Sequence, residues 1–231
     1  MGIRLIINYL HEFLLKIRKF FCDFHHFVIP SVMAIKFPKI AQQLIALRDA
    51  DLTLRERLLR SGQANGTYHP EMEAMHQYHA DLLEEILDRI GYPGTEKVGA
   101  EANEAAWLIV QHAIGRPAFQ RNYLALLEQA GEETAPRQLA YLSDRIAVFE
   151  GRPQRYGTQF DWDEEGQLSP QPVDDPAAVD RRRAVLGLPS LATQTLRIRA
   201  RARDEGESAP ADLPRYHREQ EAWRRSVGWI S

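Results

Sequence analysis

Apolar residues at helical spacing, interrupted by prolines and glycines, constrain the fold of this chain more than any other feature. Between residues 38 and 151 they recur every three or four positions, the spacing that places them on one face of an α-helix. Prolines stand where the repeating runs begin and glycines where they end, as is typical of helix boundaries. The short connections favour a bundle-like core. The pattern predicts five main helices, at residues 38–60, 70–90, 95–113, 117–130 and 136–150.

After Gly151 the pattern changes, and the sequence predicts a small β-hairpin. Residues 155–162 contain aromatic residues and a threonine, residues 163–166 are turn-like, and residues 167–173 are extended by their prolines. A short helix near 176–186 and a last helix near 214–227 follow, whereas helical periodicity is lost beyond Leu191. We therefore expect a mainly α fold, that is, a helical bundle-like core with a small β-hairpin.

The two ends of the chain differ from its middle. Residues 33–180 carry 14 basic and 24 acidic side chains, a net charge of −10, whereas residues 181–231 carry 11 basic and six acidic ones. An acidic body with a basic tail argues against nucleic-acid binding. We expect a helical core domain at 33–191, with the hairpin near 155–173, and a basic C-terminal extension at 192–231. Residues 1–32 are expected to be an N-terminal extension, with Met33 as an alternative start.

Neither a membrane span nor a secretory signal is expected. The apolar stretch at residues 3–28 is interrupted by six charged residues and three histidines, whereas a span needs about 20 mostly apolar residues. An amphipathic helix on a membrane surface is the alternative interpretation of this stretch. Cys22 is the only cysteine, so an intramolecular disulfide and a thiolate zinc site are both excluded. These features favour a cytoplasmic protein.

Familiar catalytic and nucleotide-binding motifs are absent, which leaves polar residues at positions where a helix should be apolar. His112 follows Leu108 and Ile109 by four and three residues, so it lies on or beside the packing face of its helix. A buried imidazole needs hydrogen-bond partners or serves as an acid or base. A hydrogen-bonded core histidine is the alternative. Gln111, directly before it, is a candidate binding residue.

Asp144 and Arg145 interrupt the apolar stripe of the fifth predicted helix in the same way. The carboxylate is a candidate for orienting His112, and the guanidinium is a candidate for holding an anion. Tyr156 and Gln159, near the start of the predicted hairpin, would offer a hydroxyl and an amide to a ligand. Structural ion pairs and a well-packed hairpin anchor are the respective alternatives.

A metal site has weaker support. His69, His76 and His79 lie on one side of the second predicted helix, but no Asp or Glu at a matching spacing completes a ligand set. We therefore expect no metal and no organic cofactor. Asp51 and Arg55, four residues apart, have the spacing of a surface salt bridge.

Several motifs, in order along the chain, resemble those of a bacterial family of uncharacterised proteins, a domain of unknown function. The resemblance covers residues 39–191 and brings no known activity. Its main motifs are Gln111-His112, Asp144-Arg145-Ile146, the segment 151–159 that ends in Tyr-Gly-Thr-Gln, and Asp180-Arg181-Arg182-Arg183 before Gly187-Leu188. Asp51 with Arg55 and the turn Gly91-Tyr92-Pro93 also look like family features.

The residues together favour an enzyme without a bound cofactor that carries out hydrolysis or another acid/base reaction on a small anionic molecule. Water would be the attacking group, because no nucleophile motif is present. Two alternatives stay open: a non-catalytic module that binds a small molecule or a protein, and a structural protein whose polar groups form a buried network. We expect His112 as acid/base, Asp144 as its orienter and Arg145 or Arg182 as anion clamp. Further binding residues are expected at Gln111, Tyr156, Gln159, Asp51 and Arg55. Of these, His112, Asp144 or Arg145, and Tyr156 or Gln159 are expected to converge on one site.

Overall fold

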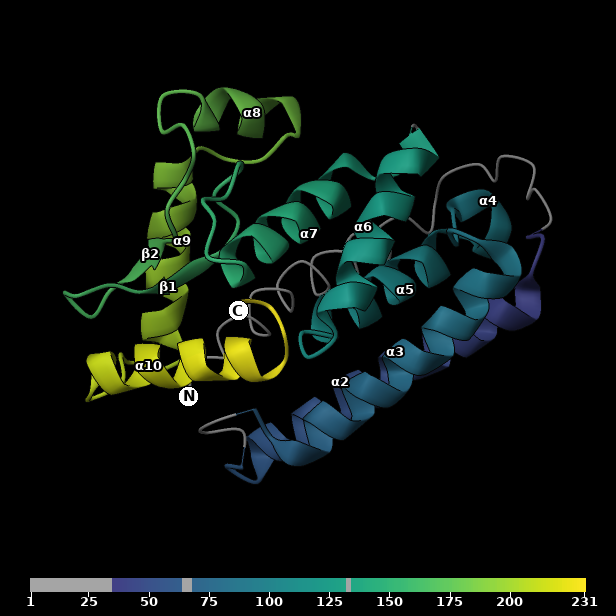
Figure 1. Cartoon of the computed structure of the whole chain (residues 1–231), viewed down its shortest axis with the longest axis horizontal. Helices are drawn as coiled ribbons and strands as arrows, with labels where there is room; N and C mark the ends of the chain where they lie inside the picture. The colour runs from purple at the N-terminus through teal and green to yellow at the C-terminus, as the bar shows by residue number, and fades with distance from the viewer. Residues whose placement is uncertain (1–34, 64–67, 132–133) are drawn as a thin grey trace. The chain divides into compact units, whose positions relative to one another are not determined.

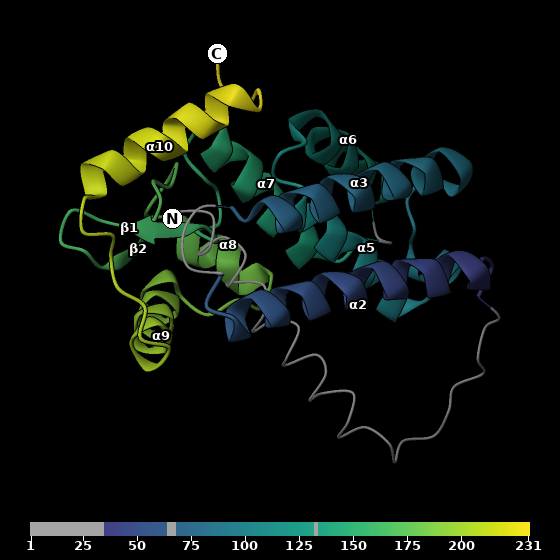
Figure 2. The ribbon, with the colours of Figure 1, turned by 90° about the horizontal axis from the view of Figure 1, so that it is seen from below.

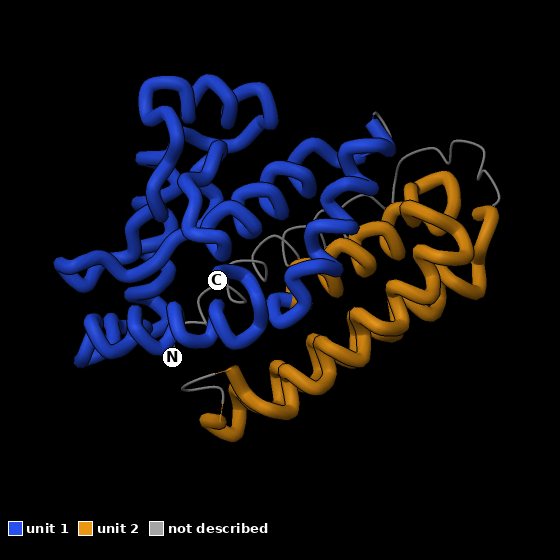
Figure 3. The backbone as a smooth tube through the Cα atoms, in the orientation of Figure 1, with its two compact units in different colours: residues 1–2, 114–231 blue, residues 3–113 orange. Residues whose placement is uncertain are grey.

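The structure is a computed structural model that describes residues 35–63, 68–131 and 134–231. These residues form two compact units, which Figure 3 draws in different colours. Residues up to Ala113 belong to unit 2, and residues from Ile114 belong to unit 1. The expected extension at residues 1–32 lies outside the described residues.

Unit 2 is built from helices alone among its described residues. They are α2 (Pro38–Arg60), α3 (Pro70–Ile90), the short α4 (Thr95–Val98) and α5 (Ala100–His112). Proline opens both long helices, because a helix has no use for an N–H in its first turn. Helices α2 and α3 lie side by side, and α5 packs against both of them (Figures 1 and 2). Their contact buries apolar side chains that include Leu44, Leu83, Ile86 and Leu108.

The third predicted helix, at 95–113, is in fact two helices. Gly99 separates α4 from α5 and has a φ of +83°. Residues other than glycine rarely adopt this left-handed backbone conformation, so a single glycine in the sequence accounts for the break. The interruption leaves α5 as a separate element that ends at His112.

Unit 1 combines helices with the hairpin. Helices α6 (Pro117–Ala130) and α7 (Pro136–Phe149) pack together. Strands β1 (Phe160–Trp162) and β2 (Leu168–Pro170) pair antiparallel, with Phe160 opposite Pro170. Helices α8 (Val179–Val185), α9 (Leu191–Asp204) and α10 (Leu213–Ser226) follow. The fold is therefore mainly α with a small β-hairpin, as the sequence predicted. Among the described residues, none of the helices has both the length and the apolar character of a membrane span.

The C-terminal residues differ from the sequence prediction. Residues 191–204 were expected to lack helical periodicity, yet they form α9, whose Arg199 donates from Nε to the carbonyl of Leu168 at 2.8 Å. The Tyr216 hydroxyl of α10 donates to Asp161 of the hairpin at 2.7 Å. The two helices thus hold the hairpin between them (Figure 2). Periodicity missed α9 because only Ile198 and Ala202 of that helix are buried.

Candidate functional site

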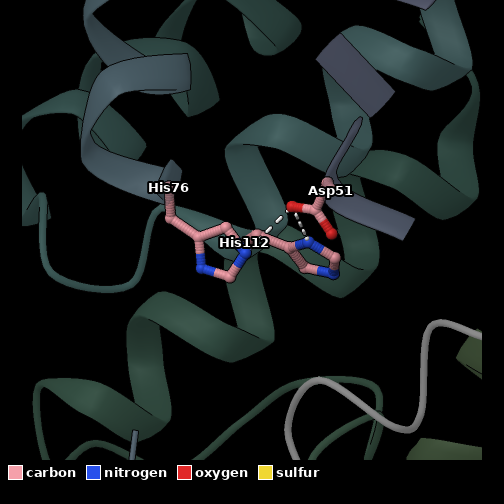
Figure 4. Close-up of side chains that lie close together, drawn as sticks. All are labelled: Asp51, His76 and His112. Carbon is pink, nitrogen blue, oxygen red and sulfur yellow. Dashed lines mark hydrogen bonds and ion pairs between the residues drawn. The ribbon is translucent and has the colours of Figure 1, made fainter. Parts of the chain in front are cut away.

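Three helices of unit 2 each place one polar side chain in a single buried cluster. Asp51 comes from the middle of α2, His76 from the first half of α3, and His112 is the last residue of α5 (Figure 4). Their exposed fractions are 1%, 2% and 2%. We call these three residues the Asp–His–His cluster. Each sits on the packing face of its helix, so the contact of α2, α3 and α5 is what assembles it.

One carboxylate oxygen contacts both rings. Oδ2 of Asp51 lies 2.9 Å from Nδ1 of His112 and 2.9 Å from Nε2 of His76. The first contact is a hydrogen bond. The second lacks hydrogen-bond geometry, since Nε2 of His76 has no hydrogen-bond partner among the described residues. The ring centroids of His76 and His112 are 5.0 Å apart. The cluster is therefore compact but only partly satisfied by hydrogen bonds.

The two imidazoles control the charge of the carboxylate. Burial by itself would raise the pKa of Asp51, but the contacts with His112 and His76 outweigh burial and hold that pKa well below its usual range. Asp51 therefore stays ionised in a site from which water is largely excluded. A carboxylate held against a ring nitrogen fixes the orientation of the ring.

Tyr68, which precedes α3, supports the cluster from outside. Its hydroxyl is hydrogen-bonded to Nδ1 of His76 and lies 3.5 Å from the carbonyl oxygen of His112. Burial, followed by the negative charges of Glu73 and Asp51, raises the pKa of Tyr68 above its usual value, so the hydroxyl keeps its proton. Both ring nitrogens of His76 are consequently in contact with an oxygen, one on each side.

The three histidines of α3 separate into different environments. His69 accepts a hydrogen bond from the N–H of Glu71 at 3.3 Å and caps the helix, whereas His76 belongs to the cluster. His79 is also buried, and its Nδ1 has no hydrogen-bond partner among the described residues. Burial lowers the pKa of His79 below its usual value, so the ring is held neutral. The sequence expectation of a shared histidine face therefore holds for His76 and His79 but not for His69.

Asp144 performs a different task from the one that the sequence suggested. Its two carboxylate oxygens accept the backbone N–H groups of Arg155, Tyr156 and Thr158 at 2.8 to 3.1 Å, together with the Thr158 hydroxyl at 3.0 Å. The carboxylate that contacts Nδ1 of His112 is Asp51. Asp51 thus makes the contact with His112 that was expected of Asp144, and Asp51 is buried rather than part of a surface salt bridge. Asp144 instead anchors residues 155–158.

The Tyr-Gly-Thr-Gln motif is a loop held by side chains of unit 1, ahead of the strands. The Gln154 amide donates to the carbonyl of Gln159 and accepts the N–H of the same residue, at 2.9 and 2.8 Å. Arg183, which is buried, donates to the carbonyls of Tyr156 and Gly157 at 2.7 and 3.1 Å. Sequence reasoning missed both supporting residues. The signal available for Arg183 was its place in an Asp-x-Arg-Arg motif, and the neighbouring Arg182 was chosen instead.

The other predicted binding residues are distributed over both units. Gln111 and Arg55 lie in unit 2, Gln111 fully buried beside His112 and Arg55 partly buried one turn after Asp51. In unit 1, burial lowers the pKa of the fully buried Arg145 to about 9. Arg182 donates to Asp174 at 2.5 Å and to the carbonyl of Arg155 at 2.9 Å. Gln159 donates from Nε2 to the Thr158 hydroxyl. The expected convergence of His112 with the unit 1 residues stays a prediction.

Comparison with known proteins adds a family but no activity. Residues 38–202 match the model of a family of unknown function, DUF6624. Neither curated proteins nor solved structures gave a match. The matched range includes the whole Asp–His–His cluster, the Asp144-anchored loop and almost all of α9.

Proposed function

Because the chain belongs to this family of unknown function, from which no activity follows, we propose from its site that it is an enzyme that hydrolyses a small anionic molecule by acid/base catalysis. The proposal places the reactive centre at the Asp–His–His cluster. One observation carries it: a single ionised carboxylate oxygen lies 2.9 Å from a nitrogen of each of two buried imidazoles. Titratable side chains in such mutual contact, with a strongly perturbed carboxyl pKa, are typical of sites that transfer protons.

His112 is the acid/base in this proposal, and Asp51 is its orienter. The carboxylate holds His112 through Nδ1, so the ring can take a proton from water through Nε2 and return it to a leaving group. Asp51 stabilises the positive charge that forms on the ring, as a buried carboxylate does in other histidine-based sites. His76 is held against the same oxygen. Because a positive charge forms on His112 during the reaction, an anionic substrate is favoured, and the burial of the cluster restricts it to a small one.

A structural role is the competing function, and one observation favours it. All three side chains of the cluster are at most 2% exposed, whereas an enzyme must admit its substrate. A buried polar network that serves only stability needs no such access. The two functions differ in what they require of His112. The structural role requires its hydrogen bond for folding, and the enzymatic role requires its proton transfer for turnover.

The substitution His112→Asn tests the proposal. We would assay the full chain against p-nitrophenyl phosphate, p-nitrophenyl sulfate and a carboxylate-bearing p-nitrophenyl ester. The variant should lose at least about 100-fold in kcat/KM while unfolding within about 1 kcal/mol of the parent chain. His217→Asn is the matched control, because His217 is exposed on α10 and should change neither quantity.

Three results would contradict the proposal. If no substrate is turned over and His112→Asn destabilises the chain by more than about 2 kcal/mol, the structural network is the better account. If an anionic substrate analogue binds but is not converted, the chain is a binding module. If turnover survives the loss of His112, the reactive centre lies elsewhere.

A further inference from the structure

We propose that the Asp–His–His cluster binds a divalent transition-metal ion of the zinc class. Asp51, His76 and His112 each offer one ligand atom, and these atoms all lie within 4.8 Å of one another. The role of this ion in activating water rests on the proposed function above, whereas its binding does not. The inference reverses the sequence expectation of a metal-free chain.

The donor set selects the class of ion. Two imidazole nitrogens and one carboxylate oxygen suit zinc and iron(II), whereas magnesium and calcium prefer sites made of oxygen alone. Asp51 supplies the one carboxylate of the donor set. Its charge offsets part of the charge of the ion, which makes the buried position tolerable for a cation.

The distances fit an ion with small adjustments. Ligand atoms about 2.0 to 2.2 Å from a zinc ion lie about 3 to 3.5 Å from one another. Oδ2 of Asp51 is already 2.9 Å from Nε2 of His76 and from Nδ1 of His112. All three ligand atoms lie within 4.8 Å of one another, so no separation has to shrink by more than about 1.5 Å to reach this range.

Two atoms of the cluster lack hydrogen bonds. Oδ1 of Asp51 and Nε2 of His76 are buried and have no hydrogen-bond partner among the described residues, although Nε2 lies 2.9 Å from Oδ2 of Asp51. Buried polar atoms in native proteins are nearly always hydrogen-bonded, so two atoms without a hydrogen bond in one cluster need an explanation. An ion bound by Nε2 and by the carboxylate would satisfy both.

Tyr68 stands where a supporting residue of a metal site is expected. A histidine that binds a metal through one nitrogen usually holds its other nitrogen by a hydrogen bond to an oxygen. The hydroxyl of Tyr68 is hydrogen-bonded to Nδ1 of His76, which leaves Nε2 for the ion. Tyr68 is therefore a positioning residue in this proposal. Three protein ligands also leave the ion a position for water, whose pKa such ions lower.

The experiment measures metal binding by the full chain. After treatment with a chelator and its removal, the chain is titrated with Zn²⁺, with Co²⁺ as a spectroscopic probe and with Mg²⁺ as a control, and the bound metal is counted by elemental analysis. We expect one Zn²⁺ per chain, ligand-field absorption from bound Co²⁺, and no binding of Mg²⁺. A chain that binds no Zn²⁺, or binds it no more tightly than Mg²⁺, overturns the proposal.

Substitutions locate the ion. His76→Ala and His112→Ala should each weaken Zn²⁺ binding by more than about 100-fold, and Tyr68→Phe by about 10- to 100-fold. His69→Ala and His217→Ala remove histidines outside the cluster and should leave binding unchanged. Because an alanine variant can fail to fold, Asp51→Asn provides a nearly isosteric test of the same site. Binding that survives Asp51→Asn, His76→Ala and His112→Ala places the ion elsewhere and overturns the proposal.

The outcome is separable from that of the proposed function. If Zn²⁺ binds at the cluster but no substrate is hydrolysed, the metal site stands and the enzymatic proposal fails. If hydrolysis depends on His112 but persists after all metal is removed, the enzymatic proposal stands and the role of the ion in activating water is overturned. If hydrolysis is lost with the metal and returns on adding Zn²⁺ to the chelated chain, the metal site stands and His112 acts as a ligand of the ion rather than as the acid/base.

Discussion

Asp51 in unit 2 and Asp144 in unit 1 have the same exposed fraction, 1%, but their pKa values are shifted in opposite directions. Asp51 is contacted by two imidazoles, and these hold its pKa well below the usual range. Asp144 accepts hydrogen bonds from three backbone N–H groups and one hydroxyl. Burial nevertheless dominates at Asp144 and raises its pKa. The nature of the partners, rather than the degree of burial, separates the two.

This difference has a functional meaning. Backbone N–H groups are fixed by the chain, so Asp144 can only hold its loop in place. Imidazoles are side chains that gain and lose protons or bind an ion, so the contacts of Asp51 can be exchanged during function. A buried carboxylate therefore suggests chemistry when its partners are titratable side chains, and architecture when they are backbone donors. The predictions that follow test this distinction.

The largest effect on stability should come from Asp144→Ala. The substitution leaves the N–H groups of Arg155, Tyr156 and Thr158 without their acceptor in a buried loop, and each such loss costs about 1 to 3 kcal/mol. We expect a loss of about 3 to 5 kcal/mol in the free energy of unfolding, measured with denaturant. Asp144→Asn should lose less, because it keeps one acceptor oxygen. A loss under about 1 kcal/mol for the alanine variant would break the comparison.

A smaller effect is expected in the loop that Asp144 anchors. Gly157 has a φ of +65°, and an added Cβ would lie 2.7 Å from Cδ1 of Leu191. Gly157→Ala should cost about 1 to 2 kcal/mol from the backbone conformation, plus the cost of moving Leu191. Gly151→Ala is the matched control, since Gly151 has a φ of +72° and open space around its Cβ position. The two variants should differ by the Leu191 contact alone, and equal thermal midpoints would show that the contact is free to relax.

Asp51→Asn should cost little stability in spite of its complete burial. The amide oxygen can still accept from Nδ1 of His112, and no backbone donor loses a partner. We expect a change of about 1 kcal/mol or less in the free energy of unfolding, together with loss of Zn²⁺ binding. This pairing of intact stability with lost function is the reverse of what Asp144→Asn should give. A loss comparable to that of Asp144→Ala would identify Asp51 as a structural residue.

The smallest effect concerns a third carboxylate, the partly buried Asp161, which also accepts hydrogen bonds from neutral donors. It accepts hydrogen bonds from the Tyr216 hydroxyl and from the N–H of Trp162. Burial raises its pKa in the fold above the ordinary value of 3.8. The protonated form is thus favoured by folding, so its contribution is present below pH 3.8 and is lost as the pH rises through the raised pKa.

Asp161→Asn should remove this loss, because the amide does not ionise. Denaturant unfolding at pH 4, 5.5 and 7 should therefore show that the free energy of unfolding of the variant increases relative to that of the parent chain as the pH rises. If the parent chain instead becomes more stable relative to the variant over this range, then neutral donors do favour the ionised carboxylate. The contrast between Asp51 and Asp144 then needs another cause.

Much of the local structure follows from the sequence. Four helices begin at prolines where the pattern places them, and α3 has the predicted bounds, Pro70–Ile90. The reason is physical, because caps, prolines and apolar spacing act over a few residues along the chain. The prediction was wrong where the local signals are weak. Helix α9 was missed because few of its residues are buried, and the break at Gly99 between α4 and α5 was missed because it depends on a single residue.

Three of the polar residues that the sequence singles out, His112, Asp51 and Asp144, are buried in the structure. What the sequence did not determine was their partners. His76 was set aside because no acidic residue stood at a matching spacing along its own helix, whereas the tertiary structure brings Asp51 to it from α2. His112 received Asp144 as a partner because both interrupt apolar stripes, yet Asp51, 61 residues away in sequence, makes the contact. Side-chain spacing along one helix reports which face is buried, and only the packing of α2, α3 and α5 decides which buried groups meet.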